Sequence, residues 1–268
     1  MKTVIIIGGG AAGLFAAYAA AKNNNHVILL EKNEKLGKKI YITGKGRCNL
    51  TNDCEPEEYI KNVVKNPKFT YGAINSMPPS KVMDFFEENG LKLKVERGRR
   101  VFPVSDKASD VTKTLEKAII SLGVDVRLNI VVKALIVNEG VIKGVCTDKG
   151  SIMGDSVIVC TGGVSYPLTG STGDGYKFAE SVGHTVVPPK PALVGIELLD
   201  GFLPELQGLS LKNVKLTAKR GEKIIYSDTG EMLFTHFGIS GPIVLSCSSF
   251  INTEKPNDIK LFIDFKPA

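Results

Sequence analysis

The chain has 268 residues, of which 43% are hydrophobic and 23% are charged, the proportions of an ordinary globular protein with a large core. No apolar run approaches the length of a membrane span, and the five scattered cysteines form no CxxC pair, so we expect no membrane segment, disulfide framework or zinc site. The net charge of +6 could suit a nucleic acid, but the lysines are dispersed and a basic arm is missing, so we predict no nucleic-acid partner.

The first predicted elements are a strand, a glycine-rich turn and a helix. Val4–Ile7 is a short apolar run of β-branched residues, the composition of a strand buried on both faces. The run enters Gly8-x-Gly10-x-x-Gly13, and the alanine-rich Leu14–Ala21 that follows favours a helix. In such a turn Gly8 permits the tight bend, Gly10 lets the backbone approach a pyrophosphate, and Gly13 lets the helix pack closely on the strand. This order of elements is typical of a dinucleotide-binding site.

A second strand and a terminal acid complete this pattern. His26–Leu30 is apolar and leads into Glu31, the spacing at which a carboxylate accepts hydrogen bonds from an adenosine ribose. The helix N-terminus at Ala11 and Ala12 would offer unpaired N–H groups to the phosphates. A chance glycine turn is the alternative, but all these features fall within the first 31 residues, so we favour the dinucleotide site. Glu31 argues against a 2′-phosphate here, although the neighbouring Lys32 leaves that point open.

The next part of the chain predicts an irregular loop and then a series of helices and strands. The loop, Lys32–Asn52, is rich in glycine and lysine and shows no clear periodicity. Three helices that each start at a proline follow, at Pro56–Val64, Pro67–Ser76 and Pro79–Glu88. Beyond them we predict strands at Leu91–Glu96 and Arg100–Val104, a helix over Lys107–Leu122 capped by Ser105 and Asp106, and a parallel strand at Val124–Leu128.

The second half of the chain is richer in strands. Tight turns separate Val131–Asn138, Val141–Thr147 and Gly150–Gly154, which predicts a β-meander in place of a crossover helix. A core strand at Ser156–Cys160 and a helix from Gly173 to Val182 follow. From Pro188 a stiff linker leads into strands at Val194–Leu199, Val214–Arg220, Glu222–Ser227 and Ile259–Phe265, with one helix over Gly241–Phe250. We therefore predict an α/β protein with a Rossmann-like first domain over residues 1–189 and a β-rich domain over residues 190–268.

A dense run of glycine, threonine and asparagine at Gly37–Asn52 is the second informative feature, because such residues leave many donors free to meet a ligand. The run matches every element of the pattern G-[KR]-K-[IL]-x-[IV]-[ST]-G-x-G-R-C-N-x-[TS]-N. Together with the N-terminal fingerprint it resembles bacterial FAD-dependent oxidoreductases with a two-dinucleotide-binding fold, which include aminoacetone oxidases and reductases of bile-acid pathways. The resemblance continues through Gly98–Pro103, Thr161–Pro167 with Thr169–Gly175, and Gly230–Pro242.

The resemblance implies FAD as the cofactor of the first site. The pyrophosphate would lie on the glycine turn, the adenine against the meander, and the flavin end near the Gly37–Asn52 run. The residues that the resemblance places around FAD are Gly8, Gly10, Ala11, Ala12, Gly13, Glu31, Lys32, Lys39, Thr43, Gly44, Gly46, Arg47, Cys48, Asn49, Val132, Thr161 and Gly162.

The implied activity is hydride transfer between a flavin and a small organic substrate, with NAD(P)H as one candidate reductant. The β-rich domain would be inserted into the FAD-binding domain and would cover the substrate. Because family members are longer and return to complete the first domain, we expect this chain to be an N-terminal portion. A flavin- or nucleotide-binding module without turnover is therefore the alternative. An RNA-modifying flavoprotein is a second alternative, but the basic C-terminal region that would distinguish it is missing.

Several residues have a structural interpretation beside a functional one. Arg47 could form a loop salt bridge, and Cys48 could be a small buried residue. Arg99–Arg100 could steer an anionic substrate or lie on a solvated turn. For His236 we favour capping or packing over acid–base catalysis, and Tyr166 is equally ambiguous. We therefore assign no catalytic residue and no metal site. The unpaired cysteines, and a start without a targeting segment, predict a cytoplasmic protein.

Overall fold

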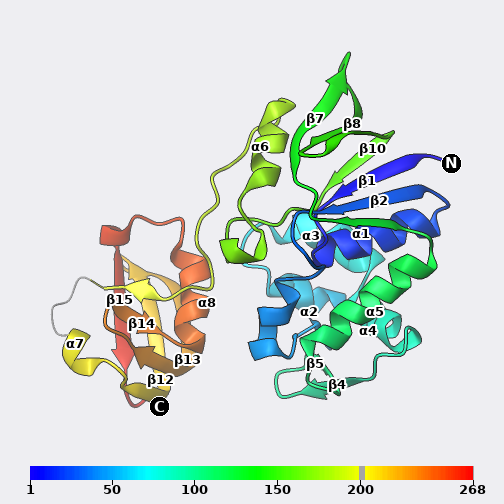
Figure 1. Cartoon of the computed structure of the whole chain (residues 1–268). Coiled ribbons are helices and arrows are strands. Elements are labelled where there is room, and N and C mark those ends of the chain that lie inside the picture. Colours follow the sequence, from blue (N-terminus) through cyan, green and yellow to red (C-terminus); the bar gives the residue numbers. More distant parts are fainter. Residues whose placement is uncertain (199–202, 268) are drawn as a thin grey trace. The chain divides into compact units, whose positions relative to one another are not determined.

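The computed structural model describes residues 1–198 and 203–267, and the chain divides into two compact units, Met1–Val186 and Val187–Ala268 (Figure 1). The division lies close to the change of pattern that we noted at Pro188. Each unit has its own hydrophobic core. Of the helices in these described ranges, none is both long and apolar enough to cross a bilayer.

The first unit is built on a four-stranded parallel sheet with the strand order β10-β1-β2-β6. Its strands are β1 (Thr3–Ile7), β2 (His26–Glu31), β6 (Asp125–Leu128) and β10 (Ser156–Val159). In register, Val4 of β1 pairs with Val27 of β2 on one side and with Ser156 of β10 on the other. The predicted parallel strands are therefore present, and the order places β1 in the middle of the sheet, where both of its edges are hydrogen-bonded.

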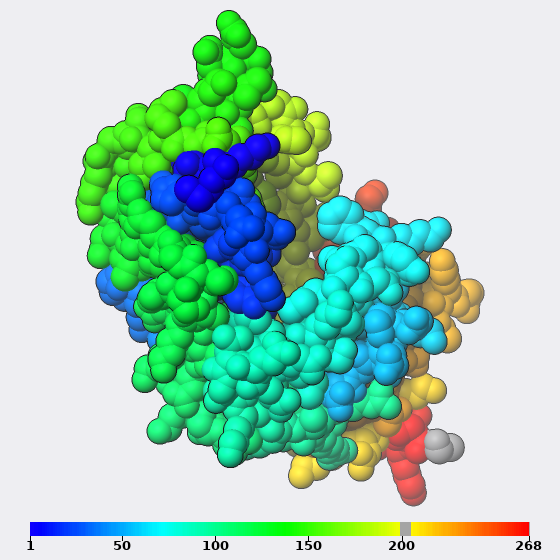
Figure 2. Space-filling model, turned by 90° about the vertical axis from the view of Figure 1, so that its right-hand side faces the viewer, coloured from blue at the N-terminus to red at the C-terminus, as the bar shows by residue number. Residues whose placement is uncertain are grey.

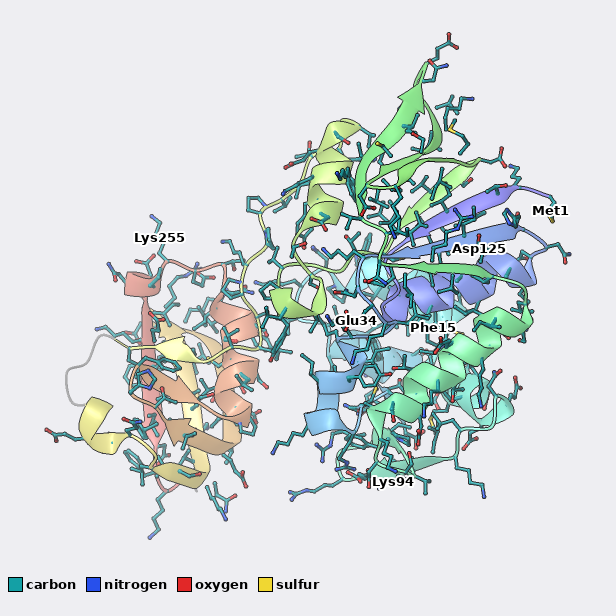
Figure 3. All side chains as sticks on the ribbon, in the orientation of Figure 1. Met1, Phe15, Glu34, Lys94, Asp125 and Lys255 are labelled. Carbon is teal, nitrogen blue, oxygen red and sulfur yellow. The ribbon has the colours of Figure 1, made fainter. Side chains whose placement is uncertain are left out.

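Alternating side chains of β1 face two different layers. Val4 and Ile6 pack against helices, which are α1 (Ala11–Lys22), α4 (Pro79–Glu88) and α5 (Ala108–Ser121). On this side Phe15 of α1 contacts the ring of Phe85 of α4, with ring centroids 5.0 Å apart (Figure 3). Ile5 is completely buried on the opposite face of the sheet. Burying a side chain of this size stabilises the folded state by about 1.5–3 kcal/mol, so the alternation fixes the sheet between two layers.

The layer on the opposite face is the predicted β-meander. It is an antiparallel sheet of β7 (Val132–Asn138), β8 (Val141–Thr147) and β9 (Gly150–Met153). Val145 of β8 is fully buried against the odd-numbered residues of β1. In Figure 2 the green part of the chain, which includes the meander and β10, lies beside the dark-blue N-terminal residues, and β10 pairs with β1. After the meander and β10, α6 (Asp174–Ser181) completes the unit.

A further group of elements in the first unit comes between β2 and α5 in the chain order. A small sheet has the order β3-β5-β4, with β3 (Thr51–Asn52), β4 (Leu93–Glu96) and β5 (Arg100–Pro103), beside helices α2 (Pro56–Lys61) and α3 (Pro67–Ser76). Two expectations were wrong here. The segment predicted as an irregular loop contains 3-10 helical turns in η1 (Ile40–Gly46), although Thr43, Gly44 and Lys45 within it have the non-helical backbone angles of a loop. The N-cap of α5 is Lys107 and no side chain caps it, because the Asp106 carboxylate is instead paired with Arg47 and Lys94.

In its described residues, the second unit is an antiparallel sheet of five strands covered by a helix. The strand order is β11-β14-β13-β12-β15, with β11 (Ile196–Glu197), β12 (Ser210–Arg220), β13 (Lys223–Phe234), β14 (Gly238–Ser240) and β15 (Ile259–Asp264). Helix α8 (Pro242–Ile251) packs Val244 and Cys247 on Leu216 and Met232 of the sheet. Short helical turns occur at α7 (Leu203–Leu206), η2 (Pro167–Thr169) of the first unit, and η3 (Pro256–Asp258).

The strands of this unit differ from the predictions in length. β12 and β13 are longer than expected, because their mutual pairing extends through polar residues such as Asp228 and Thr229 that carry no strand signal of their own. Of the strand predicted at Val194–Leu199, only β11 is formed, and Leu199 lies outside the described residues.

Candidate functional site

A cavity of about 290 Å³ lies in the first unit, at the carboxyl end of β1 and the N-terminus of α1. This is the edge at which ligands bind in open parallel sheets. Of the residues that the sequence places around a dinucleotide, those that line the cavity are Gly8, Gly10, Ala11, Ala12, Glu31, Lys32, Lys39, Thr43, Val132, Thr161 and Gly162. Gly13 lies behind the cavity, between helix and strand, and Gly44, Gly46, Arg47, Cys48 and Asn49 are not part of its lining.

The three fingerprint glycines have different surroundings. Gly8 has a φ of +105°, and a Cβ added there would lie 2.5 Å from the carbonyl oxygen of Cys160, which directly follows β10. A Cβ on Gly13 would lie 1.8 Å from the carbonyl oxygen of Gly8, so the helix packs on the strand at a distance that only glycine allows. At Gly10 an added Cβ would meet no atom within 4 Å. The backbone at Gly10 is therefore open to a ligand, whereas Gly8 and Gly13 serve packing.

The N-terminus of α1 also faces this space. The helix begins at Ala11, and Gly10 is its N-cap. Within the described residues no side chain caps this end, and the first turn carries no acidic residue. The first N–H groups of a helix have no intrahelical acceptor, and together with the helix dipole they favour an anion. The turn can therefore hold a phosphate group.

The carboxylate of Glu31 is buried and held in one orientation. Its Oε2 atom accepts a hydrogen bond of 2.7 Å from the backbone N–H of Gly9, inside the glycine turn. Its Oε1 atom accepts two hydrogen bonds from Asn33, one from the backbone N–H at 2.8 Å and one from Nδ2 at 2.6 Å. Each carboxylate oxygen can accept more than one bond, so the oriented group retains capacity for a ligand hydroxyl. Asn33 is a site residue that sequence reasoning missed.

Two lysines connect the β2 side of the cavity to residues far along the chain. Lys32 Nζ donates to Thr172 Oγ1 and to Asp174 Oδ2, each at 2.7 Å. Lys39 Nζ donates to the carbonyl oxygen of Ser165 at 2.7 Å and to Ser171 Oγ at 2.6 Å. Burial lowers the pKa of Lys39. These contacts close one side of the cavity with the segment that precedes α6.

Another part of the cavity lining is apolar. Ile7 and Leu30 of the parallel sheet, Val132 of the meander, and Phe178 of α6 line it together with Ile130. A mostly apolar wall with a few placed polar groups is typical of cofactor sites. In this arrangement a planar base would lie against the apolar wall, a ribose beside Glu31, and a diphosphate at Gly10. Among the residues that the structure describes, His, Cys, Asp and Glu side chains form no group of three that could hold a metal ion.

Comparison with known proteins agrees with this geometry. The sequence profile of the HI0933-like protein Rossmann domain matches residues 2–241. The chain belongs to this family. Its resemblance to flavoproteins with a dinucleotide-binding fold, and the α/β fold class, are thereby confirmed.

The HI0933-like chain is similar to two kinds of curated protein. It is 35% identical over 251 residues to a 3-dehydro-bile acid delta(4,6)-reductase of Clostridium scindens, which covers 89% of this chain and 58% of the relative. It is 33% identical over 239 residues to a ribosomal RNA dihydrouridine synthase of Haemophilus influenzae, which covers 87% of this chain and 57% of the relative. The chain thus spans somewhat more than half the length of these relatives. Because one kind of relative acts on RNA, the absence of a nucleic-acid partner stays a prediction.

Solved structures with the same fold include a flavocytochrome c3 fumarate reductase and a 3-ketosteroid-delta4-(5alpha)-dehydrogenase of Rhodococcus jostii RHA1. The first has a TM-score of 0.57 at 24% identity and covers 79% of this chain and 47% of the other. The second has a TM-score of 0.55 at 14% identity and covers 79% of this chain and 60% of the other. At these identities the likeness concerns the fold.

Part of the Gly37–Asn52 run of this HI0933-like chain has structural contacts instead of cavity contacts. Arg47 Nε donates to Asp106 Oδ1 at 2.7 Å, its Nη2 donates to Glu96, and its guanidinium lies 4.1 Å from the ring centroid of Phe102. Lys94, which is labelled in Figure 3, forms ion pairs with the same two carboxylates, those of Glu96 and Asp106. Arg47 therefore forms the kind of loop salt bridge that we gave above as its structural interpretation.

The neighbours of Arg47 have a similar role. Gly44, Lys45 and Gly46 all have positive φ, and a Cβ on Gly44 would lie 2.9 Å from the backbone nitrogen of Asn49. Cys48 is buried in the main core, and this burial raises the pKa of its thiol. The tight turn places Thr43, which lines the cavity, and Cys48 in backbone contact, with Cys48 N donating to Thr43 O at 3.1 Å. The conformation of the run thus supports one wall of the cavity.

Besides Asn33, sequence reasoning missed several other residues of the cavity lining, among them Ser171, Asp174 and Phe178. The contacts of Lys32 with Thr172 and Asp174 join residues 140 and 142 positions apart, which no local pattern shows. A partial signal was present, because Thr169–Gly175 is one of the stretches on which the family resemblance rests.

Proposed function

We propose that the first unit binds FAD and that the protein is an FAD-dependent oxidoreductase. The observation that carries this proposal is the cavity itself, where the open backbone at Gly10, the uncapped N-terminus of α1 and the oriented Glu31 carboxylate meet. These groups match a diphosphate and a ribose. The space beside the backbone of Gly10 is free of other atoms, so a diphosphate could approach the backbone there. When bound, FAD supplies the hydride chemistry, and the protein supplies position and electrostatics.

The roles of individual residues form part of the proposal. Gly10, Ala11 and Ala12 would hold the diphosphate, Glu31 the adenosine ribose, and Val132 the adenine. Lys39, Thr43 and Thr161-Gly162 would bind the rest of the cofactor. Residues 190–268 would form the substrate domain.

We infer further that the substrate carries a carbon–carbon double bond conjugated to a carbonyl group. This inference rests on the relatives, because a delta(4,6)-reductase and a dihydrouridine synthase both add hydrogen across such a bond. A small organic substrate is the first candidate, with NAD(P)H as the reductant and the cytoplasm as the compartment. A uridine in ribosomal RNA is the second candidate, favoured by the 33% identity to the Haemophilus influenzae enzyme.

The test begins with the visible absorption spectrum of the purified protein. We expect flavin bands, and acid release of about one FAD per chain, because one dinucleotide would occupy the proposed site. The reduced protein is then mixed without oxygen with a 3-oxo-4,6-diene steroid or with undermodified ribosomal RNA, and the return of the flavin bands is followed. If the flavin bands return with the steroid alone, the first candidate is supported. If they return with the RNA alone, the second is supported.

Two outcomes would contradict the proposal. Bound FAD that neither compound reoxidises would indicate a binding module without turnover. A colourless protein that takes up no added FAD would contradict the cofactor assignment for this polypeptide.

A separate prediction concerns Arg47. We expect Arg47→Met to change the dissociation constant for FAD by less than about twofold, because its guanidinium is engaged with Asp106 and Glu96 and does not line the cavity. The variant should also unfold more easily. Lys39→Met is the matched control, since it also replaces one cation by methionine but lies in the cavity lining, and it should weaken binding about tenfold. Titration of each apoprotein with FAD measures the two dissociation constants. Equal losses of affinity in the two variants would show that Arg47 is a cofactor ligand.

A further inference from the structure

The segment Ser165–Asp174 closes one side of the cavity, and two lysines from the opposite side hold it. Lys32 follows β2 directly and holds the end of the segment, at Thr172 and Asp174. Lys39 precedes η1 and holds its start at Ser165, and also Ser171. The segment is therefore fixed to the cavity mainly by side-chain contacts. We call it the roof.

The two lysine contacts differ in kind. Lys32 forms an ion pair with Asp174, and Thr172 Oγ1 donates a further hydrogen bond of 3.0 Å to the same carboxylate. Burial by itself would raise the pKa of Asp174, but the hydrogen bonds from Lys32 and Thr172 outweigh it and leave the pKa lowered. Asp174 is also the first residue of α6, where the helix dipole favours a negative charge. The pair is thus a charge-assisted contact that keeps Asp174 ionised.

Lys39 has a different environment. Its ammonium group contacts the neutral oxygen atoms of Ser165 and Ser171, and the ion pairs of the described residues do not include it. A partly desolvated cation with neutral partners can exchange them for an anion at little cost. Lys39 is therefore suited to turn from the roof toward a phosphate, whereas Lys32 is already neutralised by Asp174.

The backbone of the roof turns sharply and packs closely on the residues beneath it. Tyr166, Gly170 and Gly173 have φ values of +52°, +103° and +81°, so the segment turns sharply at three points. A Cβ on Gly170 would lie 2.7 Å from Asn33 Nδ2, which places the roof directly on the residue that orients Glu31. The outer side is different: the side chain of Leu168 is 92% exposed. Leu168 therefore does not anchor the roof to the rest of the unit.

Resting on the proposed FAD site, we propose that the Lys32–Asp174 ion pair is a clasp that holds the roof closed and so controls how long the cofactor stays bound. Because Thr169, Gly170, Ser171 and Asp174 of the roof line the cavity, movement of the roof would widen the way by which a dinucleotide enters and leaves. Lys32 and Asp174 are positioning residues in this scheme, because they act through the roof.

The test is the rate at which FAD leaves the loaded protein, followed by the rise in flavin fluorescence after dilution. Asp174→Asn removes the charge and should speed release about fivefold, the value expected for a partly exposed ion pair with one further hydrogen bond. Asp125→Asn is the matched control, because Asp125 is also in an ion pair, with Arg127 at 2.6 Å, on β6 of the same unit. It should leave the release rate unchanged.

Further variants separate the clasp from direct binding and from misfolding. If Lys32 acts through Asp174, Lys32→Met in the Asp174→Asn background should add little to the release rate; if Lys32 instead binds FAD directly, the two effects should multiply. Thr172→Val keeps both charges and should speed release by a smaller factor, which provides a readout should Asp174→Asn fold poorly. Release from Asp174→Asn at the rate of Asp125→Asn would overturn the clasp alone. Failure of the unaltered protein to bind FAD would instead overturn the proposed function.

Discussion

Replacing Gly10 with valine is expected to abolish FAD binding while the protein stays folded. Gly10 has φ −80° and ψ −173°, a conformation that valine adopts readily, and an added Cβ meets nothing within 4 Å. The Cβ of the new side chain would therefore cause no clash in the apoprotein. It would, however, fill the space through which a diphosphate approaches the N-terminus of α1. We expect a loss of at least about 100-fold in affinity, equal to about 3 kcal/mol, measured by titration with FAD.

Gly13→Ala is the contrasting change in the same turn. Its Cβ would lie 1.8 Å from the carbonyl oxygen of Gly8, a backbone atom that cannot rotate away, so α1 must move off β1. We expect the free energy of unfolding to fall by about 1–3 kcal/mol, with the loss of FAD following from the displaced helix. Thermal unfolding of both apoproteins separates the two effects. Retention of FAD by the valine variant at Gly10 would show that the cofactor does not cross this turn.

This pair of glycines shows what the sequence could reveal. The distinct roles of Gly8, Gly10 and Gly13 follow from strand, turn and helix being adjacent in the chain, so local rules were sufficient. The contacts of Asp174 and Ser171 could not be found in this way, because they depend on how a distant segment folds back over the cavity. The family resemblance identified the stretch, but only the structure shows which atoms meet.

Charged residues were the least predictable part of the chain. Ser105 and Asp106 have the sequence of a helix cap, but Arg47 and Lys94 compete for the Asp106 carboxylate, and a charge-assisted hydrogen bond is stronger than a neutral one. The partners of Arg47 lie 49 and 59 positions away, so the motif that contains Arg47 could not indicate that it faces them. The predicted strand lengths in the second unit were wrong for a related reason, because β13 continues through polar residues wherever β12 pairs with it.

Glu31 is the site of the second large expected effect. Its carboxylate accepts the N–H of Gly9 and two donors of Asn33, so it links the glycine turn to the residue under the roof. Glu31→Gln replaces one acceptor oxygen by an NH₂ group. In either orientation of the amide this group would face a donor, either the N–H of Gly9 or those of Asn33. An unsatisfied buried donor costs about 1–3 kcal/mol, so we expect the free energy of unfolding of the apoprotein to fall by that amount. The affinity for FAD should fall at least about tenfold as well, because the ribose loses its acceptor and the turn its orientation.

The measurement that separates these two consequences is urea unfolding with and without FAD. A ligand that binds the folded state alone stabilises it according to its concentration and dissociation constant, so the gain in stability on adding FAD reports the affinity independently of the starting stability. For the unaltered protein the gain at 100 times the dissociation constant should be about 2.7 kcal/mol, and at the same FAD concentration Glu31→Gln should show a clearly smaller gain. Asn33→Ala is the matched control, because it removes the Nδ2 donor and keeps the carboxylate and its bond from Gly9. If Glu31→Gln lost stability but kept the full gain from FAD, Glu31 would organise the turn without contacting the cofactor, and the ribose would have to be held elsewhere in the cavity.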